Sequence, residues 1–212
     1  MLKNLAINIS IKNRKKKYQY FLEQMKPNAG TQILDVGFTE DDPYPGINFL
    51  ERNYPYHKNI TALGIEDAPT FKKNFPEVKV VMYDGSIFPF ADKIFDIAWS
   101  NAVIEHVGGY DKQVLFLSEL LRTSKSIFIT TPNRWFPIEV HTRLPFLHYL
   151  PKNIFDKLLP LFGKGWAGGD YMNLLSVNDI KKMLKQLNVN SYIIKRNKKF
   201  GATMDFVLIV KQ

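Results

Sequence analysis

The sequence predicts an α/β protein: a doubly wound, mostly parallel sheet of seven strands with a Rossmann-like arrangement. Two observations carry this prediction. Short apolar segments alternate with helix-like segments through residue 131, which is the pattern of parallel strand–helix–strand units. After residue 131 the alternation stops, and an aromatic and proline-rich insertion precedes a last helix and two last strands.

Each element has its own signal along the chain. A first helix is expected over residues 11–26, where Tyr18, Phe21, Leu22 and Met25 recur at helical spacing before Pro27. Apolar runs predict core strands at residues 32–37, 59–66, 78–84, 95–101 and 126–131. Helices are expected at residues 46–56, 69–74, 110–123 and 179–187, the last with Ser176 as N-cap. Residues 191–195 and 204–210 are expected to form a closing hairpin.

The length of 212 residues suits a single domain spanning residues 1–212. Within it we expect an N-terminal helical segment (1–30), a core (31–131), a lid-like insertion (132–175), and a C-terminal helix with closing strands (176–212). No internal repeat or low-complexity segment interrupts this order.

Composition excludes several function classes. The chain has no cysteine, which excludes disulfides, thiolate nucleophiles and Cys-ligated zinc or iron–sulfur centres. Its net charge of +9 reflects either an ordinary solvated surface or contact with an anionic partner. No apolar run approaches the roughly 20 residues of a membrane span, so we expect a cytoplasmic protein, peripheral to the membrane at most.

The ends of the predicted strands carry the informative side chains, because ligands of open α/β sheets bind beyond the carboxyl ends of the strands. The first strand ends at Asp35-Val36-Gly37 and the second at Glu66. The third ends at Tyr83-Asp84-Gly85, and the fourth at Ser100-Asn101. A single acid at such a place is commonly a turn or cap residue, but suitable residues at four successive strand ends favour a nucleoside site.

These segments resemble class I S-adenosylmethionine-dependent methyltransferases that act on small molecules, the methyltransferase type 11-like family. The resemblance covers residues 33–131, about half of the chain, and the stretch 95–107 carries it most specifically. It implies S-adenosyl-L-methionine as cofactor. It also implies that the residues that bind it are Asp35, Gly37, Phe38, Glu66, Asp84, Gly85, Ser86 and Asn101. In that arrangement Glu66 holds the ribose, Asp84 faces the adenine amine, and Asn101 lies by the methionine end.

One loop departs from the family pattern. Thr39 and Asp41 stand where the family usually has further glycines, so the loop must take another path, and Asp41 or Asp42 is a candidate to neutralise the sulfonium. A literal Gly-x-Gly-x-x-Gly occurs at Gly163–Gly168, but a helix-like segment precedes it rather than a strand. It therefore lacks the context of a dinucleotide fingerprint.

Catalysis in such enzymes is an in-line displacement that depends mainly on alignment, and a general base assists when the acceptor is a hydroxyl or an ammonium. His106 is the candidate base, with a loop-stabilising histidine as the alternative. Some methyltransferases bind magnesium through a Glu-x-x-Glu-His run and a later histidine. Here Ala102 replaces the first glutamate, so no metal is expected.

The insertion follows the fifth predicted strand, so it is placed to form a lid. Trp135, His141, Arg143 and Trp166 are its candidate acceptor contacts, and packing within the insertion is the alternative role for its aromatic residues. Residues 144–162 are unusually apolar, which favours a lipid-like acceptor or docking on an anionic membrane.

Methyl transfer to a small-molecule or lipid-like acceptor is thus the leading hypothesis, with the oligomeric state left open. An RNA methyltransferase is the second. The Asn/Asp-Pro-Pro-aromatic run of amino-methylating nucleobase enzymes is absent after the fourth strand, and ring-carbon methylation lacks its cysteine. A non-catalytic methyltransferase-like scaffold is the third, favoured by the altered loop.

Overall fold

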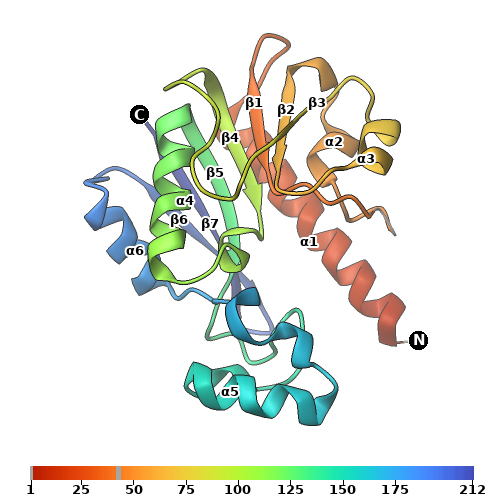
Figure 1. Ribbon diagram of the computed structural model, residues 1–212, viewed down its shortest axis with the longest axis vertical. Helices are drawn as coiled ribbons and strands as arrows, with labels where there is room; N and C mark the ends of the chain where they lie inside the picture. The colour runs from red at the N-terminus through yellow and green to blue at the C-terminus, as the bar shows by residue number, and fades with distance from the viewer. Residues whose placement is uncertain (1, 42–43) are drawn as a thin grey trace. The chain divides into compact units, whose positions relative to one another are not determined.

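The computed structural model describes residues 2–41 and 44–212, so Asp42 lies outside the described residues. Its sheet has seven strands in the order β3-β2-β1-β4-β5-β7-β6 (Figure 1). The strands are β1 (Ile33–Val36), β2 (Ile60–Gly64), β3 (Lys79–Met82), β4 (Phe95–Asn101), β5 (Ser124–Pro132), β6 (Ile193–Lys199) and β7 (Ala202–Lys211). β1 pairs in parallel with β2 and β4, and β2 with β3, whereas β6 and β7 are antiparallel. The predicted seven-stranded, mostly parallel α/β sheet is confirmed.

The helices are α1 (Leu2–Met25), α2 (Phe49–Asn53), α3 (Pro69–Asn74), α4 (Tyr110–Thr123), α5 (Lys152–Leu158) and α6 (Val177–Gln186). The predictions for α3 and α4 match these bounds. The prediction for α1 began too late, because the apolar residues before residue 11 continue the helix. The helix predicted at residues 46–56 is only α2, since Asn48 takes a left-handed conformation and Pro55 follows soon after.

The chain divides into two compact units. Unit 1 comprises Met1–Trp99 and Thr123–Phe128, and unit 2 comprises Ser100–Arg122 and Ile129–Gln212. The chain passes between the units at three places: after Trp99 in β4, after Arg122 at the end of α4, and after Phe128 in β5.

An aromatic cluster forms the core of unit 1. Phe21 of α1 meets Trp99 edge-on at 4.9 Å and Phe128 at 5.4 Å between ring centroids. Trp99 and Phe128 stack at 5.2 Å. Burial of such rings supplies a large hydrophobic contribution with specific geometry, so α1 is fixed against β4 and β5 through the face that its spacing predicted.

Unit 2 carries the insertion, which has a small core of its own. Phe155, Leu159, Ala167 and Met172 are buried together, with Leu144, Leu147 and Leu174 packed around them. Within this unit, α5 lies apart from α4 and α6 (Figure 1). Ser176 caps α6 as predicted, in a capping box with Asp179.

The basic C-terminal segment forms a strand rather than a tail. The strand predicted at residues 191–195 runs instead through Lys199, so Lys195, Lys198 and Lys199 lie on β6 at the edge of the sheet. Lysines on an edge strand oppose pairing with a second chain, which gives these charges a structural role. No helix among the described residues is long and apolar enough to cross a membrane.

Candidate functional site

The carboxyl ends of β1, β2 and β3 form a continuous edge in unit 1. The Gly37 amide donates to the Leu63 carbonyl over 3.1 Å, and the Tyr83 amide donates to the Gly64 carbonyl over 3.0 Å. Gly37 has a φ of 97°, a conformation that favours glycine. These bonds bring together the loops that begin at residues 37, 65 and 83, which we call the unit 1 edge.

Two predicted acids lie on the unit 1 edge with different surroundings. Glu66 is exposed in the bend after β2. Asp84 is exposed too, and its carboxylate accepts the Ser86 amide over 2.9 Å as well as the Ser86 hydroxyl. These bonds lower the pKa of Asp84, and Gly85 adopts a φ of 86° within the turn. Asp84 thus stabilises its own turn, which leaves further acceptor positions on its carboxylate directed to solvent.

Phe38 is held by packing against its neighbours on this edge. Its ring lies 4.5 Å from that of Phe71 in α3. A Cβ added at Gly64 would come within 2.6 Å of the Phe38 ring. Gly64 therefore provides the space that Phe38 occupies.

The loop that lacks the family's later glycines is secured by side chains. The Asn48 side chain bonds the amide and the carbonyl of Thr39, each at 2.9 Å. The Glu40 carboxylate accepts the amides of Thr70 and Phe71 at the start of α3, and the hydrogen bonds from Thr70 lower its pKa. Thr39 and Glu40 are thus fixed in place by specific hydrogen bonds.

Asp35 is buried in β1, next to Glu51 of α2. Burial raises the pKa of Asp35 well above its usual range, and the neighbouring Glu51 carboxyl raises it further. Two buried carboxyls in contact do not both ionise at low cost, so the charged form of Asp35 is disfavoured. Asp35 is directed into the interior of unit 1.

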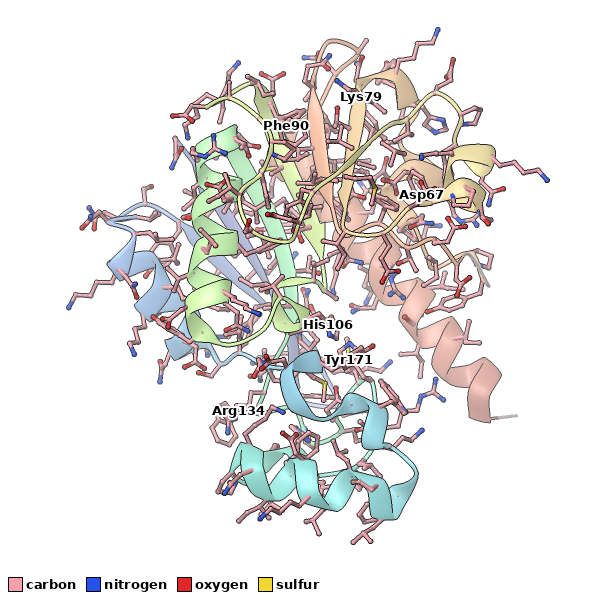
Figure 2. All side chains as sticks on the ribbon, in the orientation of Figure 1. Asp67, Lys79, Phe90, His106, Arg134 and Tyr171 are labelled. Carbon is pink, nitrogen blue, oxygen red and sulfur yellow. The ribbon has the colours of Figure 1, made fainter. Side chains whose placement is uncertain are left out.

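Unit 2 contains a group of acidic and histidine side chains, Glu105, His106, Glu139 and His141, which we call the histidine cluster. Nε2 of His106 lies 3.2 Å from Nε2 of His141. Nδ1 of His106 is 2.7 Å from the Tyr171 carbonyl oxygen, and Figure 2 shows the two residues side by side. Nδ1 of His141 is 2.7 Å from Oε1 of Glu139. Each imidazole is therefore oriented through one nitrogen and faces the other imidazole through its second nitrogen.

The two glutamates of the histidine cluster are both fully buried side chains. Burial raises the pKa of Glu105, whose Oε2 accepts the Thr131 hydroxyl over 2.9 Å. Burial also acts to raise the pKa of Glu139, but hydrogen bonds from His141 and Thr142 outweigh it and bring that pKa to about 2. Glu139 is therefore ionised, and acts as an acceptor. Glu105, His106 and His141 present ligand-type atoms within 4.8 Å of one another.

Of the four other predicted residues in unit 2, one packs beside the histidine cluster and three have different surroundings. Trp166 packs edge-on against Tyr171 at 5.3 Å, and Tyr171 lies 5.0 Å from His106, so Trp166 joins the surroundings of the histidine cluster. Trp135 contacts Tyr149 and the Arg134 guanidinium instead. Arg143 is exposed, with a φ of 62°. Asn101 accepts the Thr130 hydroxyl over 2.6 Å.

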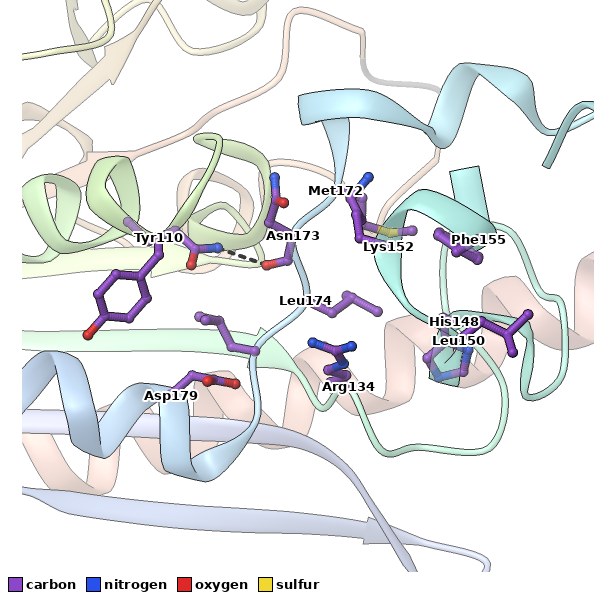
Figure 3. Close-up of a pocket in the computed structure, with 12 residues that line it drawn as sticks. Tyr110, Arg134, His148, Leu150, Lys152, Phe155, Met172, Asn173, Leu174 and Asp179 are labelled. Carbon is purple, nitrogen blue, oxygen red and sulfur yellow. Dashed lines mark hydrogen bonds between the residues drawn. The ribbon is translucent and has the colours of Figure 1, made fainter. Parts of the chain in front are cut away.

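Unit 2 also contains a pocket of about 210 Å³ beside the insertion (Figure 3). Its lining includes Arg134, His148, Lys152 and Phe155, and none of the four predicted acceptor contacts. Gln113 donates to the Asn173 carbonyl over 2.8 Å at one wall. Ligand sites commonly measure about 300–1,000 Å³, so this pocket fits a small group rather than a whole lipid.

Sequence reasoning missed Glu139 and Tyr171. Glu139 precedes His141 by two positions, a spacing too common to be informative. Tyr171 acts through its backbone carbonyl, which any residue type provides. Only the folded insertion brings these groups to His106.

A family model described as "Methyltransferase domain" matches residues 46–126. The matched segment includes Glu66, Asp84, Asn101 and His106, and it begins after the altered loop at residues 39–42. No curated protein matches the sequence.

Solved structures with the same fold include several methyltransferases. A SAM-dependent methyltransferase of Methanosarcina mazei is 14% identical, with a TM-score of 0.56 over 88% of this chain and 94% of that one. One from Archaeoglobus fulgidus is 15% identical, with a TM-score of 0.59 over 94% of each chain. The N-terminal domain of EvdMO1, solved with SAH bound, is 15% identical, with a TM-score of 0.55 over 93% of this chain and 80% of that one. At these identities the likeness establishes a shared fold.

Proposed function

From the premise that the chain carries a methyltransferase domain on the class I methyltransferase fold, we propose that it transfers a methyl group from S-adenosylmethionine to a small-molecule or lipid-like acceptor. The observation that carries the proposal is the unit 1 edge. There the exposed acids Glu66 and Asp84 follow adjacent parallel strands, where nucleosides bind in open α/β sheets.

On this edge the two acids accept hydrogen bonds from the adenosine part of the cofactor. Glu66 accepts hydrogen bonds from the ribose hydroxyls, and Asp84 accepts from the adenine amine, with Gly85 and Ser86 beside the ring. Ile65 directly precedes Glu66 in the sequence, is 65% exposed, and lies near Gly85. We assign the Ile65 side chain as the apolar surface against which the adenine ring packs. The face of this ring is apolar, whereas its edges carry the polar groups that the acids would bind.

The other predicted residues lie around the methionine part of the cofactor or support the strand end next to it. Gly37 lets the backbone approach it closely, and Phe38 borders it. Asn101 contributes through its backbone, while Asp35 acts from the interior of β1 by holding the strand end in place.

The transfer itself is an in-line displacement. The bond between the methyl carbon and the sulfonium sulfur breaks as the bond to the acceptor atom forms, and S-adenosylhomocysteine leaves. We assign His106 as the group that accepts the acceptor's proton. Its Nδ1 faces a carbonyl oxygen, so Nε2, the nitrogen that faces His141, is the atom that accepts a proton when no proton or metal ion already lies between the rings.

The acceptor side of the proposal rests on the insertion. His141 and Trp166 belong to the surroundings of His106, and Trp135 and Arg143 extend the candidate contacts across the insertion. Phe146, Leu161 and Phe162 are exposed, Leu161 by 78%. Exposed apolar side chains near Lys157 and Lys164 suit docking on an anionic membrane, from which a lipid-like acceptor would be drawn.

Calorimetry with S-adenosylmethionine tests the cofactor proposal. The wild-type chain should bind with a Kd between roughly 1 μM and 1 mM, the range typical of enzyme substrates. Glu66→Ala should weaken binding roughly 5- to 150-fold, the loss of about 1–3 kcal/mol expected for a charged acceptor.

Asp67→Ala is the matched control, because Asp67 is an adjacent exposed acid engaged by Lys72. An equal loss in both variants would contradict the assignment of Glu66. Wild-type protein that binds no cofactor would favour the non-catalytic scaffold, whereas cofactor binding together with salt-sensitive RNA binding would favour an RNA methyltransferase.

Sedimentation with vesicles tests the membrane proposal. Wild-type protein should sediment with vesicles rich in phosphatidylserine and remain in solution with phosphatidylcholine alone. Leu161→Ser with Phe162→Ser should abolish sedimentation while cofactor binding persists. Sedimentation that is unchanged in this variant would contradict the proposal.

A further inference from the structure

Two imidazoles in unit 2, those of His106 and His141, are oriented through their Nδ1 atoms. The Tyr171 carbonyl oxygen beside Nδ1 of His106 can only accept a hydrogen bond, so this nitrogen carries a proton. Glu139 beside Nδ1 of His141 also accepts the backbone amides of His141 and Thr142, so it is an ionised acceptor. Nδ1 of His141 therefore carries a proton too.

The neutral forms of both rings consequently direct a lone pair from Nε2. These two nitrogens lie only 3.2 Å apart. Two lone pairs at this distance repel each other, so a positive centre has to lie between the rings. Two kinds of centre meet this condition: a proton shared by the imidazoles, or a metal ion.

The surroundings of Glu105 favour a metal ion over a shared proton. Its side chain is fully buried, and Oε1 has no hydrogen-bond partner among the described residues. Oε1 lies 4.0 Å from Nε2 of His106. A shared proton between the rings gives this buried oxygen a cation at 4.0 Å but no hydrogen bond, and a buried oxygen without a hydrogen bond is costly. A metal ion bound by all three atoms satisfies it and removes the repulsion.

We propose that Glu105, His106 and His141 bind a divalent transition-metal ion of the Zn²⁺ class. Two imidazoles and one carboxylate form a common set of protein ligands for catalytic zinc, with a further position open to water or an acceptor oxygen. Imidazole nitrogen is a better ligand for zinc than for magnesium or calcium, which favour oxygen ligands. The carbonyl and carboxylate on the two Nδ1 atoms match the outer partners that orient metal-bound histidines.

Metal binding by the histidine cluster does not depend on the proposed function. A bound ion occupies the Nε2 lone pair that a general base would use, so a metal-loaded chain would engage the acceptor through the open metal position instead. Binding of zinc can therefore succeed or fail separately from binding of S-adenosylmethionine at the unit 1 edge.

The untagged 212-residue chain is stripped with a chelator and titrated with ZnCl₂ by calorimetry. We expect one ion per chain with a submicromolar Kd, and MgCl₂ at least about 100-fold weaker. His141→Ala and Glu105→Gln should each weaken zinc binding by more than about 10-fold. His57→Ala is the matched control, since it removes an imidazole that packs on Phe75 in unit 1, and it should leave zinc binding unchanged.

A second readout excludes misfolding as the cause of a loss. Co²⁺ should give visible absorption bands with the wild-type chain and the control, and lose them in His141→Ala, whose circular dichroism stays native. Absence of saturable zinc binding by the wild-type chain would overturn the proposal in favour of a shared proton. Equal losses in His57→Ala and His141→Ala would also overturn it.

Discussion

The unit 1 edge and the histidine cluster are built in different ways. On the unit 1 edge, short parallel strands end next to one another, and backbone hydrogen bonds set the positions of Gly37, Glu66 and Asp84. The two acids themselves remain exposed. In the histidine cluster, the glutamates are buried and each imidazole is fixed by a further group.

This difference has a functional meaning. An edge set by the backbone presents acids whose carboxylates are available to a ligand, at little cost in stability. A cluster of buried charges has to be matched internally, since each unpaired member is costly. We therefore expect substitutions on the unit 1 edge to change ligand binding, and substitutions in the cluster to change neighbouring side chains as well.

Glu139→Gln should break the cluster most strongly. The amide cannot accept the Nδ1 proton and both backbone amides as a carboxylate does, so His141 loses its fixed orientation. We expect a roughly 10- to 100-fold loss in zinc affinity, the usual effect of removing an outer partner, measured by calorimetry. An unchanged affinity would contradict the orienting role of Glu139.

Asp84→Ala tests whether this acid contacts ligand or only stabilises its turn. It should weaken S-adenosylmethionine binding roughly 5- to 150-fold. Ser86→Ala is the control, because it removes the hydroxyl that Asp84 accepts while keeping the carboxylate. If both variants bind cofactor equally weakly, the turn and not the carboxylate explains the effect.

Gly64→Ala tests the packing beneath the unit 1 edge. The new Cβ displaces Phe38, so the free energy of unfolding should fall by about 1–3 kcal/mol, measured by urea denaturation. Gly109→Ala is the comparison, because a Cβ there meets no atom within 4 Å. Equal stability of the two variants would show that Phe38 moves at no cost.

Asp35→Asn should have the smallest effect, and it should stabilise. The pKa of Asp35 is raised in the folded chain, so its contribution is favourable at low pH and is lost as pH rises through the folded value. At pH 7 the amide removes the buried acid, and the melting temperature should rise by about 2–4 °C, equivalent to roughly 1 kcal/mol. The gain should shrink toward pH 4, and a gain independent of pH would contradict this cause.

Most of the fold and the unit 1 edge were predictable because both follow from local pattern. The apolar runs gave the strands, and the residues where they stop became the edge. α1 was predicted too short, since its first residues lack clear helical periodicity. β6 was predicted to end four residues early, because Lys198 and Lys199 conceal a strand in a charged run.

The histidine cluster was predictable only in part. His106 and His141 were candidates from their positions near strand ends and in the insertion, and Glu105 is the remaining glutamate of the Glu-x-x-Glu-His run in which Ala102 replaces the first. Their convergence depends on residues 139–141 and 171 folding back to the loop after β4. No periodicity encodes such a contact between distant segments, and a backbone carbonyl leaves no trace in the sequence.

The most direct test of the cofactor site is the change in backbone amide shifts when S-adenosylhomocysteine is titrated into isotope-labelled protein. We predict saturable changes at Gly37, Ile65, Glu66 and residues 84–86. Changes confined to Gly163–Gly168, or no changes at millimolar ligand, would contradict the account.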